Sequence, residues 1–296
     1  MGATDSPGDT AIDNGTRGME DYLRVALLAA KEAGDEIKDA FHKEKQVQHK
    51  GVVDLVTETD KKCEEIVFSS IREAFPDHKF IGEEDSAAQG FTSELTDDPT
   101  WMVDPVDGTT NFVHRFPFVC VCIGLAINKK VVVGVVYNPI LDELYTAMRG
   151  KGAFLNGEPI RVSDCPDLGS ALIITEIGVT RDDATLSALF GRISAVVKGA
   201  RSVRCMGSCA LDMCFVACGR AEVSYEVGFG GPWDVAAASL IVEEAGGHVA
   251  DPAGGSFDIM GRRVLAASNI GLAQQVAALV APLPLGPKEP QLSAAS

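Results

Sequence analysis

The amino-acid sequence predicts an α/β fold built from several layers of helices and sheet. Three observations support this. An amphipathic helix pattern opens the ordered part of the chain at residue 19, short strand patterns with turn residues between them fill 117–147, and strand and helix patterns alternate after about residue 165. Each element of this kind has to bury one apolar face against another element. We therefore expect stacked layers.

Two helices are predicted before the first strand. From Met19 to His42 apolar residues recur at spacings of three and four, which gives the helix one apolar face. Residues 61–75 show the same period, and Asp60 stands where an N-cap would. We therefore expect the Asp60 carboxylate at the positive end of a helix dipole.

A hairpin-rich sheet is predicted in the middle of the chain. Residues 101–103 are apolar, and Pro105 pushes Asp104 into extended geometry, so we expect this strand to close at Asp104. The strands that follow are predicted over 117–127, 131–137 and 143–147, with turns at 128–130 and at Asn156-Gly157. Chemistry is expected where the first of these strands ends.

The second half of the chain alternates between the two patterns. The predicted strands are 171–175, 201–205, 221–227 and 263–267, and the predicted helices are 183–198, 208–218, 233–246 and 270–281. We expect one domain over 19–283, with halves that meet at about residue 165. Residues 1–18 and the proline-rich residues 284–296 are expected to be disordered tails.

The net charge limits the classes of binding partner that we expect. The 296 residues carry 26 Lys and Arg against 42 Asp and Glu, a formal net charge of −16. Nucleic acids and anionic membranes need clustered basic residues, so we expect neither as a stable partner. The sequence shows no apolar run of about 20 residues and does not open with a basic region followed by an apolar one, so we expect neither a membrane span nor secretion. Gly2 and Ser6 satisfy a loose myristoylation pattern, but no polybasic second anchor follows.

Eight cysteines are too few for a disulfide scaffold of this length. Several stand in apolar runs such as residues 118–122, which predicts buried thiols, a reducing compartment and a cytoplasmic location. The pairs Cys205/Cys209 and Cys214/Cys218 are four residues apart on a predicted helix. A soft metal is one interpretation of these pairs, but packing is favoured because no Cys-x-x-Cys or nearby His accompanies them.

Acidic residues gather where three predicted elements end or begin. Glu83 follows an apolar segment, Asp104 and Asp107 flank Pro105, and Asp234 opens a helix. Four converging carboxylates without cationic partners stay ionised in a dry site by binding metal, and hard oxygen ligands indicate Mg²⁺, with Ca²⁺ or Mn²⁺ as chemical relatives.

Gly108 permits a turn in which its own amide and those of Thr109 and Thr110 point toward one phosphate. A metal beside such a group of amides indicates phosphate-ester chemistry.

Each acidic segment alone has a simpler interpretation. Glu83-Glu84-Asp85 would be a solvated loop, Asp107-Gly108 a turn and Asp234 an N-cap. An EF-hand is excluded because Asp104 and Asp107 are three apart with proline between them. An Asp-x-Asp phosphatase motif, which uses the period of two in a strand, does not match that spacing either. Nucleotide-binding glycine loops and serine-hydrolase elbows are absent from the sequence.

Four segments resemble signatures of the inositol monophosphatase family: 53–60, 81–84, 101–112 and 233–237. The resemblance extends from about Met19 to Leu283. It implies an αβαβα layered sandwich, a homodimer, hydrolysis of small phosphate monoesters with Mg²⁺, and inhibition by Li⁺.

Positions matched to the family imply roles for the acidic residues. Glu83, Asp104 and the carbonyl of Val106 would hold a first metal, and Asp104, Asp107 and Asp234 a second. Asp60 would support a weaker third metal site. Glu83 and Thr109, counted with Asp60 as catalytic, would orient and deprotonate the attacking water.

The resemblance also implies substrate contacts. Asp107, Gly108, Thr109 and Asp234 would contact the phosphate ester, and the positions that match the family's ring-binding residues are Gly207, Ser208, Cys209, Ala210 and Glu226. Two departures from the family pattern stand out. Ala237 occupies a position that is often Gly, and the place of a family lysine falls on His49, with Lys50 next to it.

We therefore expect a Mg²⁺-dependent phosphomonoesterase acting on myo-inositol monophosphate. The segments around 204–212 and 229–233 look like plant-type members, which commonly accept L-galactose 1-phosphate too. That substrate would connect the chain to ascorbate biosynthesis as well as to inositol metabolism. The alternatives are a phosphatase of histidinol phosphate or 3′-phosphoadenosine 5′-phosphate, and a non-catalytic metal-binding regulator.

Overall fold

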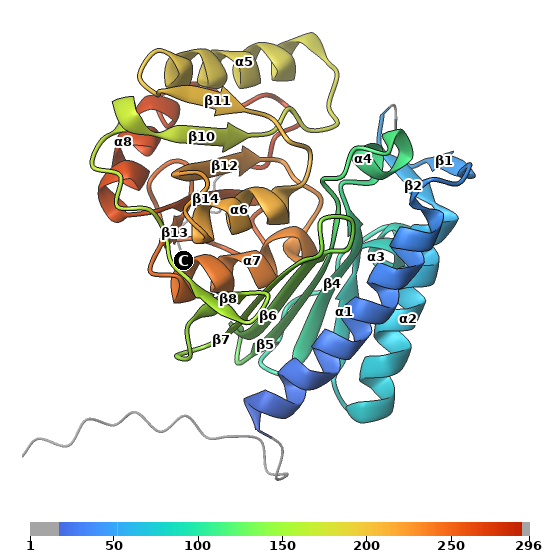
Figure 1. Ribbon diagram of the computed structural model, residues 1–296. Helices are drawn as coiled ribbons and strands as arrows, with labels where there is room; N and C mark the ends of the chain where they lie inside the picture. The colour runs from blue at the N-terminus through green and yellow to red at the C-terminus, as the bar shows by residue number, and fades with distance from the viewer. Residues whose placement is uncertain (1–17, 52, 292–296) are drawn as a thin grey trace, which may run out of the picture.

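Helices α1 (Met19–Phe41) and α2 (Glu58–Ala74) lie side by side across one face of a seven-stranded sheet in the computed structural model (Figure 1). The structure describes residues 18–51 and 53–291. The predictions for residues 1–17, namely the N-terminal tail and the myristoylation pattern, lie outside this part of the chain. The predicted helical pattern from Met19 is confirmed, with its apolar face buried.

The large sheet has the strand order β3-β4-β5-β6-β7-β8-β9. Its strands are β3 (Lys79–Gly82), β4 (Thr100–Asp107), β5 (Cys120–Ile127), β6 (Lys130–Asn138), β7 (Glu143–Met148), β8 (Ala153–Leu155) and β9 (Glu158–Ile160). Only β3 and β4 pair in parallel; the other neighbours are antiparallel. The predicted series of hairpins is confirmed, including the turn at Asn156-Gly157.

A second sheet has the order β11-β10-β12-β14-β13. Its strands are β10 (Leu172–Thr175), β11 (Ser202–Arg204), β12 (Val223–Val227), β13 (His248–Ala250) and β14 (Arg263–Ala267). Helices α6 (Cys209–Ala217) and α7 (Pro232–Glu244) fill the space between the sheets, and α5 (Asp183–Val197) and α8 (Ile270–Val280) cover the far side (Figure 1). The layers are therefore αβαβα, as the family resemblance implied.

Short elements complete the chain around the sheet ends. They are β1 (Val47–His49), β2 (Leu55–Thr57), α3 (Glu83–Gln89), α4 (Thr109–His114) and the 3-10 turn Leu168–Ser170. The sequence pattern does not predict β1, β2, α3, α4 or β13, because each is too short to show a period. In the described part of the chain, none of the helices combines the length and the apolar composition that a bilayer crossing requires.

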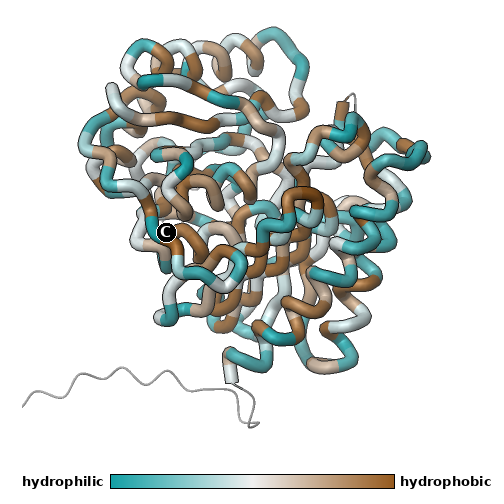
Figure 2. The backbone as a smooth tube through the Cα atoms, viewed as in Figure 1, coloured by the Kyte–Doolittle hydropathy of each residue, from teal (hydrophilic) through white to brown (hydrophobic). Residues whose placement is uncertain are grey.

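Strand β5 is apolar on both faces because it is covered on both. Val121 and Ile123 pack in the core formed with α1 and α2, whereas Cys120 and Cys122 pack in the core formed with α6 and α7. This alternation is the period of two of a strand. In Figure 2 the tube through the central strands is coloured mostly as hydrophobic. The two thiols therefore face the layer formed by α6 and α7, which carries Asp234.

Helix α7 lies unusually close to the large sheet. A Cβ atom on Gly134 of β6 would come within 2.6 Å of the carbonyl oxygen of Ala237, so only glycine fits there. Ala237 is buried at this contact. The departure from the family pattern at Ala237 is thus accommodated where the helix meets the sheet.

The C-terminal segment is packed rather than structureless. Glu289 is buried and forms an ion pair with the buried Arg192 of α5, while Arg263 of β14 donates to the carbonyl of Pro290 at 3.1 Å. For residues 284–291 the expectation of a disordered tail is therefore wrong. Its proline content gave no sign that Glu289 and the Pro290 carbonyl would contact arginines far away in sequence. Residues 292–296 lie outside the described part.

Candidate active site

A bulge in β4 turns two aspartates to the same side of the sheet. Asp104 lies opposite Cys122 of β5 and Asp107 lies opposite Cys120, so three steps along β4 match two along β5. The extra residue cancels the alternation of the strand, and both carboxylates face α6 and α7. The predicted end of the strand at Asp104 is wrong: β4 continues through Pro105, which has no N–H to pair, to Asp107.

Asp107 is held by the N-terminus of α6. Its Oδ2 accepts hydrogen bonds from Ser208 Oγ at 2.7 Å and from the backbone N–H of Ala210 at 2.8 Å. Ser208 is itself the N-cap of this helix. Free N–H groups at a helix start favour a carboxylate there. A residue of the first half of the chain is thus fixed by the second half.

Asp234 completes a group of three buried carboxylates. It lies in the first turn of α7 and accepts from the N–H of Gly231 at 3.1 Å. Ligand oxygens of Asp104, Asp107 and Asp234 all lie within 4.8 Å of one another, although the three residues are only 2%, 8% and 6% exposed. We call this group the carboxylate triad.

Burial makes the charged form of the triad costly. It raises the pKa of Asp107 to about 6, in spite of the hydrogen bonds from α6. Burial, followed by the charge of Asp107, raises the pKa of Asp234 to about 8. The pKa of Asp104 lies well above its usual value for the same first reason, with Glu83 as the next cause.

The chemistry of this donor set fits a divalent cation. None of the ion pairs among residues 18–51 and 53–291 involves a member of the triad. Buried carboxylates without a basic partner are compensated by protons or by a metal. Oxygen-only ligands are those that hard cations prefer. The triad is therefore a candidate metal centre.

The turn after the triad requires glycine. Gly108 has a φ of +96°, and a Cβ atom there would lie 2.8 Å from the carbonyl oxygen of Phe118. Helix α4 begins with the next residue, Thr109. Asn111 ties this turn to the loop before α6 through donations of 2.8 Å to the carbonyls of Phe118 and Met206. The positions expected to receive phosphate and to bind the ring are therefore held together.

The sequence suggested Asp60 as the N-cap of α2, and this prediction is wrong. Thr57 is the N-cap, and Asp60 is the third residue of a capping box, accepting from the Thr57 N–H at 2.9 Å. Its other oxygen lies 3.1 Å from Thr109 Oγ1, which is also 3.2 Å from the carbonyl of Val106. Burial raises the pKa of Asp60 to about 6. Three of the predicted site residues thus meet beside the triad.

Glu83 is the first residue of α3 and is paired with a lysine. Lys50 Nζ lies 2.8 Å from Glu83 Oε1 and 2.6 Å from Glu84 Oε1. His49, the other candidate for the family lysine position, is exposed. Burial lowers the pKa of Lys50, but the two glutamates outweigh burial and raise it above its ordinary value. Lys50 is therefore the cation at this edge of the site.

Glu64 fixes the start of α3, although it is not among the site residues that the sequence predicts. Its carboxylate oxygens accept from the backbone N–H groups of Glu84 and Asp85, each at 2.9 Å. It comes from α2, the helix that also carries Asp60. Because it is an acidic residue within an ordinary amphipathic helix, nothing in its local pattern distinguishes it from a surface glutamate.

The predicted ring-binding residues line the adjoining loop and strand. Gly207 precedes the N-cap Ser208, Cys209 opens α6, and Glu226 lies buried on β12. Burial, then the charge of Glu176, raises the pKa of Glu226 well above its usual value. Glu176 also accepts from the Gly207 N–H at 2.8 Å. It follows strand β10, so the strand-end rule applied to the other acids was the signal that could have found it.

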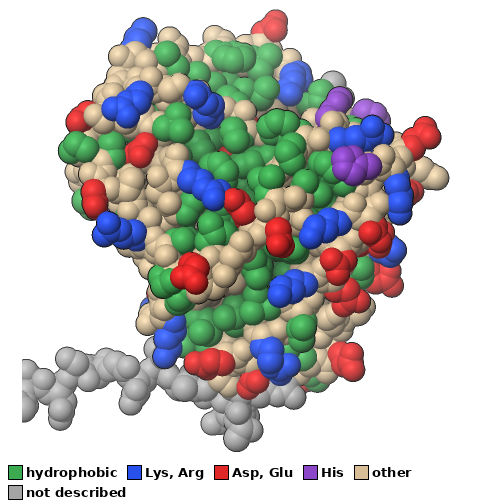
Figure 3. Space-filling view, in the orientation of Figure 1, with side chains coloured by type: hydrophobic (Ala, Val, Ile, Leu, Met, Phe, Trp, Pro, Cys, Tyr) green, Lys and Arg blue, Asp and Glu red, His purple; other side chains and the backbone are tan. Residues whose placement is uncertain are grey.

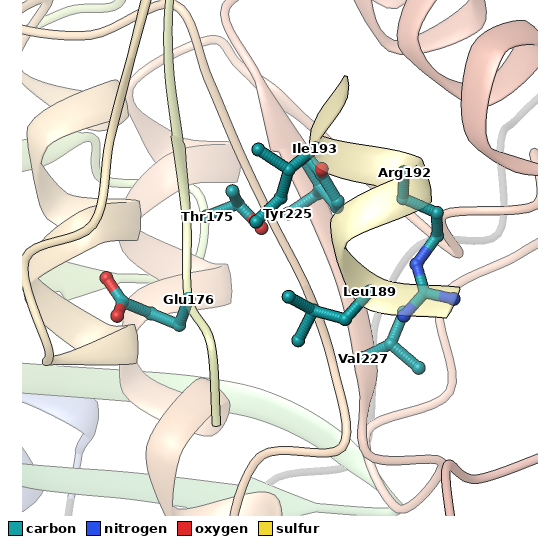
Figure 4. Close-up of a pocket in the computed structure, with 7 residues that line it drawn as sticks. All are labelled: Thr175, Glu176, Leu189, Arg192, Ile193, Tyr225 and Val227. Atoms are coloured by element: carbon teal, nitrogen blue, oxygen red, sulfur yellow. The ribbon is translucent and has the colours of Figure 1, made fainter. Parts of the chain in front are cut away.

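A hollow of about 10 Å³ lies next to this wall, between α5 and the second sheet (Figure 4). It holds about one water molecule. In Figure 4 the Glu176 carboxylate points away from Leu189 and Arg192 of α5. This hollow is too small for a sugar phosphate.

On the face shown in Figure 3, Lys and Arg side chains are scattered among Asp and Glu.

Comparisons with known proteins agree with this geometry. The model of the inositol monophosphatase family matches residues 19–284. Inositol monophosphatase 2 of Solanum lycopersicum is 61% identical over 254 residues, which cover 86% of this chain and 96% of that protein. Inositol monophosphatase 1 of Homo sapiens is 47% identical over 271 residues, 90% of this chain and 96% of that protein.

Solved structures give the same result. The extragenic suppressor protein suhB from Bartonella henselae superimposes with a TM-score of 0.79 at 34% identity, covering 88% of this chain and 98% of that one. Inositol monophosphatase from Anabaena superimposes with a TM-score of 0.77 at 33% identity, covering 90% and 97%. Sequence and fold agree over nearly the whole length, and the chain belongs to the inositol monophosphatase family.

Proposed function

We propose that this protein is a metal-dependent phosphatase that hydrolyses myo-inositol monophosphate to inositol and phosphate. The observation that carries the proposal is the buried carboxylate triad beside the glycine turn at Gly108. The triad suits cations that neutralise a phosphate ester, and the turn leads into the N-terminus of α4. The names of the plant and animal relatives support the inositol ester as substrate.

One ligand set is supported by the geometry of the triad, and the other by the family resemblance. We propose that Asp104, Asp107 and Asp234 hold one Mg²⁺, and that Glu83, Asp104 and the Val106 carbonyl hold another. When bound, these cations supply Lewis acidity to the phosphoryl oxygens and stabilise charge on the attacking and leaving oxygens. Asp104 is common to both sets, which its position at the bulge permits. We propose Li⁺ as an inhibitor that competes at this centre.

Thr109 and Asp60 form the proton-handling pair in this mechanism. The Thr109 hydroxyl lies between the Asp60 carboxylate and the Val106 carbonyl, so it can donate to one of them while it accepts from a nearby water. With a pKa of about 6, Asp60 can receive a proton near neutral pH. Glu83, fixed by Lys50, orients the water for attack on phosphorus. A covalent enzyme intermediate is not required.

We assign substrate selection to the site residues that come from the second half of the chain. Glu226 accepts from ring hydroxyls, and the loop of Gly207 and Ser208 with the start of α6 at Cys209 and Ala210 shapes the pocket for the ring. Burial and the charge of Glu176 raise the pKa of Glu226 well above its usual value, so these side chains suit a neutral polyol better than a second anionic group. L-galactose 1-phosphate shares that character and is the second substrate to compare.

The experiment is the initial rate of phosphate release from myo-inositol 1-phosphate and L-galactose 1-phosphate, with excess Mg²⁺ and with EDTA. We expect turnover that disappears in EDTA and falls when Li⁺ is added. The ratio of the two kcat/KM values identifies the preferred ring. Because one bacterial neighbour was solved with bound 2′AMP, a nucleotide phosphate belongs in the panel. Folded protein that releases no phosphate from any of them would overturn the proposal.

We also propose that the protein works in the cytoplasm as a homodimer. All eight cysteines are free thiols, as a reducing compartment requires. Exposed apolar side chains such as Leu28 and Phe116 are available for a contact between copies. Light scattering of the purified protein should give twice the mass of the 31.3 kDa chain; the monomer mass would contradict the dimer.

A further inference from the structure

Two buried thiols lie directly behind the carboxylate triad. Cys120 and Cys122 are two residues apart on β5 and therefore point to the same side of the sheet. Their Sγ atoms are 3.5 Å apart, and Cys120 Sγ is 3.8 Å from Asp107 Oδ2. Both side chains are fully buried. Ligand atoms of Cys120, Cys122 and Asp107 all lie within 4.8 Å of one another.

These distances match the edges of a tetrahedral metal site. Zinc–sulfur bonds of about 2.3 Å place two sulfur ligands about 3.8 Å apart, and a carboxylate oxygen at about 2.0 Å lies about 3.5 Å from each sulfur. Ser208 Oγ, at 3.6 Å from Cys120 Sγ, stands where a fourth oxygen ligand could lie. The two thiols and the carboxylate are thus already close to the separations that a thiophilic cation needs.

We propose that Cys120, Cys122 and Asp107 form a binding site for a thiophilic cation such as Zn²⁺ or Cd²⁺, and that its occupation inhibits the enzyme. Inhibition follows because Asp107 belongs to both groups: a cation held between it and the two thiols takes charge from this ligand and repels the cation of the triad. The binding part stands independently of the phosphatase function proposed above, whereas the inhibition part rests on it.

Ligand chemistry separates the two neighbouring centres. A hard cation stays with the three oxygens of the triad, whereas a soft one gains by moving to sulfur. Since the thiols are fully buried and Asp107 and Asp234 are 8% and 6% exposed, the triad is the route by which an ion reaches them. On binding, two metal–sulfur bonds form and two thiol protons leave to solvent. No oxidant takes part.

The first test is a titration with Cd²⁺ alone, followed by the charge-transfer absorption of cadmium bound to thiolate. To remove the exposed thiol, every protein carries Cys205→Ser. We compare this background with its Cys122→Ala variant and with a Cys63→Ala control, which deletes a different buried thiol whose Sγ lies 3.5 Å from the Ala33 carbonyl oxygen.

The background protein and the Cys63→Ala control should show the absorption, with two protons released per Cd²⁺. Cys122→Ala should lose it or weaken the affinity roughly 10- to 100-fold. Equal absorption in all three proteins, or none in the background, would overturn the site. If Cys122→Ala does not fold, Cys120→Ser, which keeps an oxygen at the same position, takes its place with the same expectation.

The second test measures inhibition of phosphate release by Cd²⁺ at saturating Mg²⁺. The inhibition constant should rise roughly 10- to 100-fold in Cys122→Ala and stay unchanged in Cys63→Ala. Equal inhibition of both variants would refute the link to Asp107. The absorption readout needs no turnover, so a protein that binds Cd²⁺ through these thiols but has no activity would refute only the proposed function.

Discussion

Asp107 shows how much a single residue depends on both halves of the chain. Its backbone belongs to β4, its carboxylate accepts from Ser208 and Ala210 of α6, and it shares the triad with Asp234 of α7. Removing charge from any member should affect metal binding more than folding, because protonated or amide forms relieve the repulsion between these groups.

The variant Asp234→Asn tests this expectation, because it replaces one carboxylate oxygen with an amide nitrogen. The amide oxygen can still accept from Gly231, so the fold and its circular dichroism should be preserved, while phosphate release should fall roughly 100-fold or more because a charged ligand is lost. The exposed Asp98→Asn serves as the control and should keep normal turnover. Near-normal release from Asp234→Asn would remove this residue from the metal site.

The raised pKa values also predict how stability depends on pH. Asp234 has a pKa of about 8 in the folded protein, against about 3.9 when unfolded. Between these values the folded state binds more protons than the unfolded state, so the free energy of unfolding falls as pH rises. The stabilising contribution of protonated Asp234 is complete below about pH 4 and is lost as pH passes about 8.

Urea unfolding in EDTA at several pH values between about 4 and 9 measures this effect. The stability of the wild type relative to Asp234→Asn should decrease as pH rises, and added Mg²⁺ should remove most of the decrease because the cation replaces the protons. A difference that does not change with pH, or one that grows in favour of the wild type, would show that burial does not control this carboxyl.

At the scale of elements, the site depends on how strands and helices end. The bulge in β4, the start of α6 and the turn at Gly108 bring together segments that are far apart in the sequence. Each of these ends has free N–H groups or an irregular backbone, which regular ladders do not offer.

Gly108→Ala tests the turn. The new methyl would lie 2.8 Å from the Phe118 carbonyl oxygen, and alanine is strained at the positive φ that the turn requires. We therefore expect stability to fall by about 1–3 kcal/mol and kcat/KM to fall with it. Gly90→Ala is the matched control, since Gly90 also has a positive φ but meets open space. Its smaller stability loss should leave kcat/KM unchanged. Equal losses of kcat/KM in both variants would contradict a specific role for the turn.

At the scale of the whole molecule, the C-terminal segment fastens α5 to the second sheet. Arg192 and Glu289 are both buried and lie 97 residues apart in sequence. Arg192→Ala should lower the free energy of unfolding by about 3–5 kcal/mol because it leaves a buried carboxylate without its partner. Urea unfolding measures the change.

The exposed pair Arg161 and Asp164 provides the comparison, and Arg161→Ala should cost less than about 1 kcal/mol. An apolar double variant, Arg192→Met with Glu289→Leu, should lose less stability than Arg192→Ala alone. If Arg192→Ala instead costs no more than Arg161→Ala, residues 284–291 do not contribute to stability in solution.

Long, periodic elements were predictable because their signal is local. The helix from Met19, the hairpins of the large sheet and the alternation after residue 165 all follow from side-chain spacing, and the structure has them within a few residues of the predicted bounds. The acidic residues were predictable as candidates because oxygen ligands beside permissive turns are unusual in a core. The sequence did not show, however, how these acidic side chains are brought together in the fold.

The sequence by itself determined the layered class, the family and the candidate acidic side chains Asp60, Glu83, Asp104, Asp107, Glu226 and Asp234. Only the tertiary structure decided that β4 continues past Pro105 with a bulge that turns Asp104 and Asp107 to one face. It also decided that Lys50 rather than His49 pairs with Glu83, and that two thiols lie behind Asp107. The physical reason is that periodicity reports one residue's neighbours along the chain, whereas register, capping and charge pairing depend on partners brought close by folding.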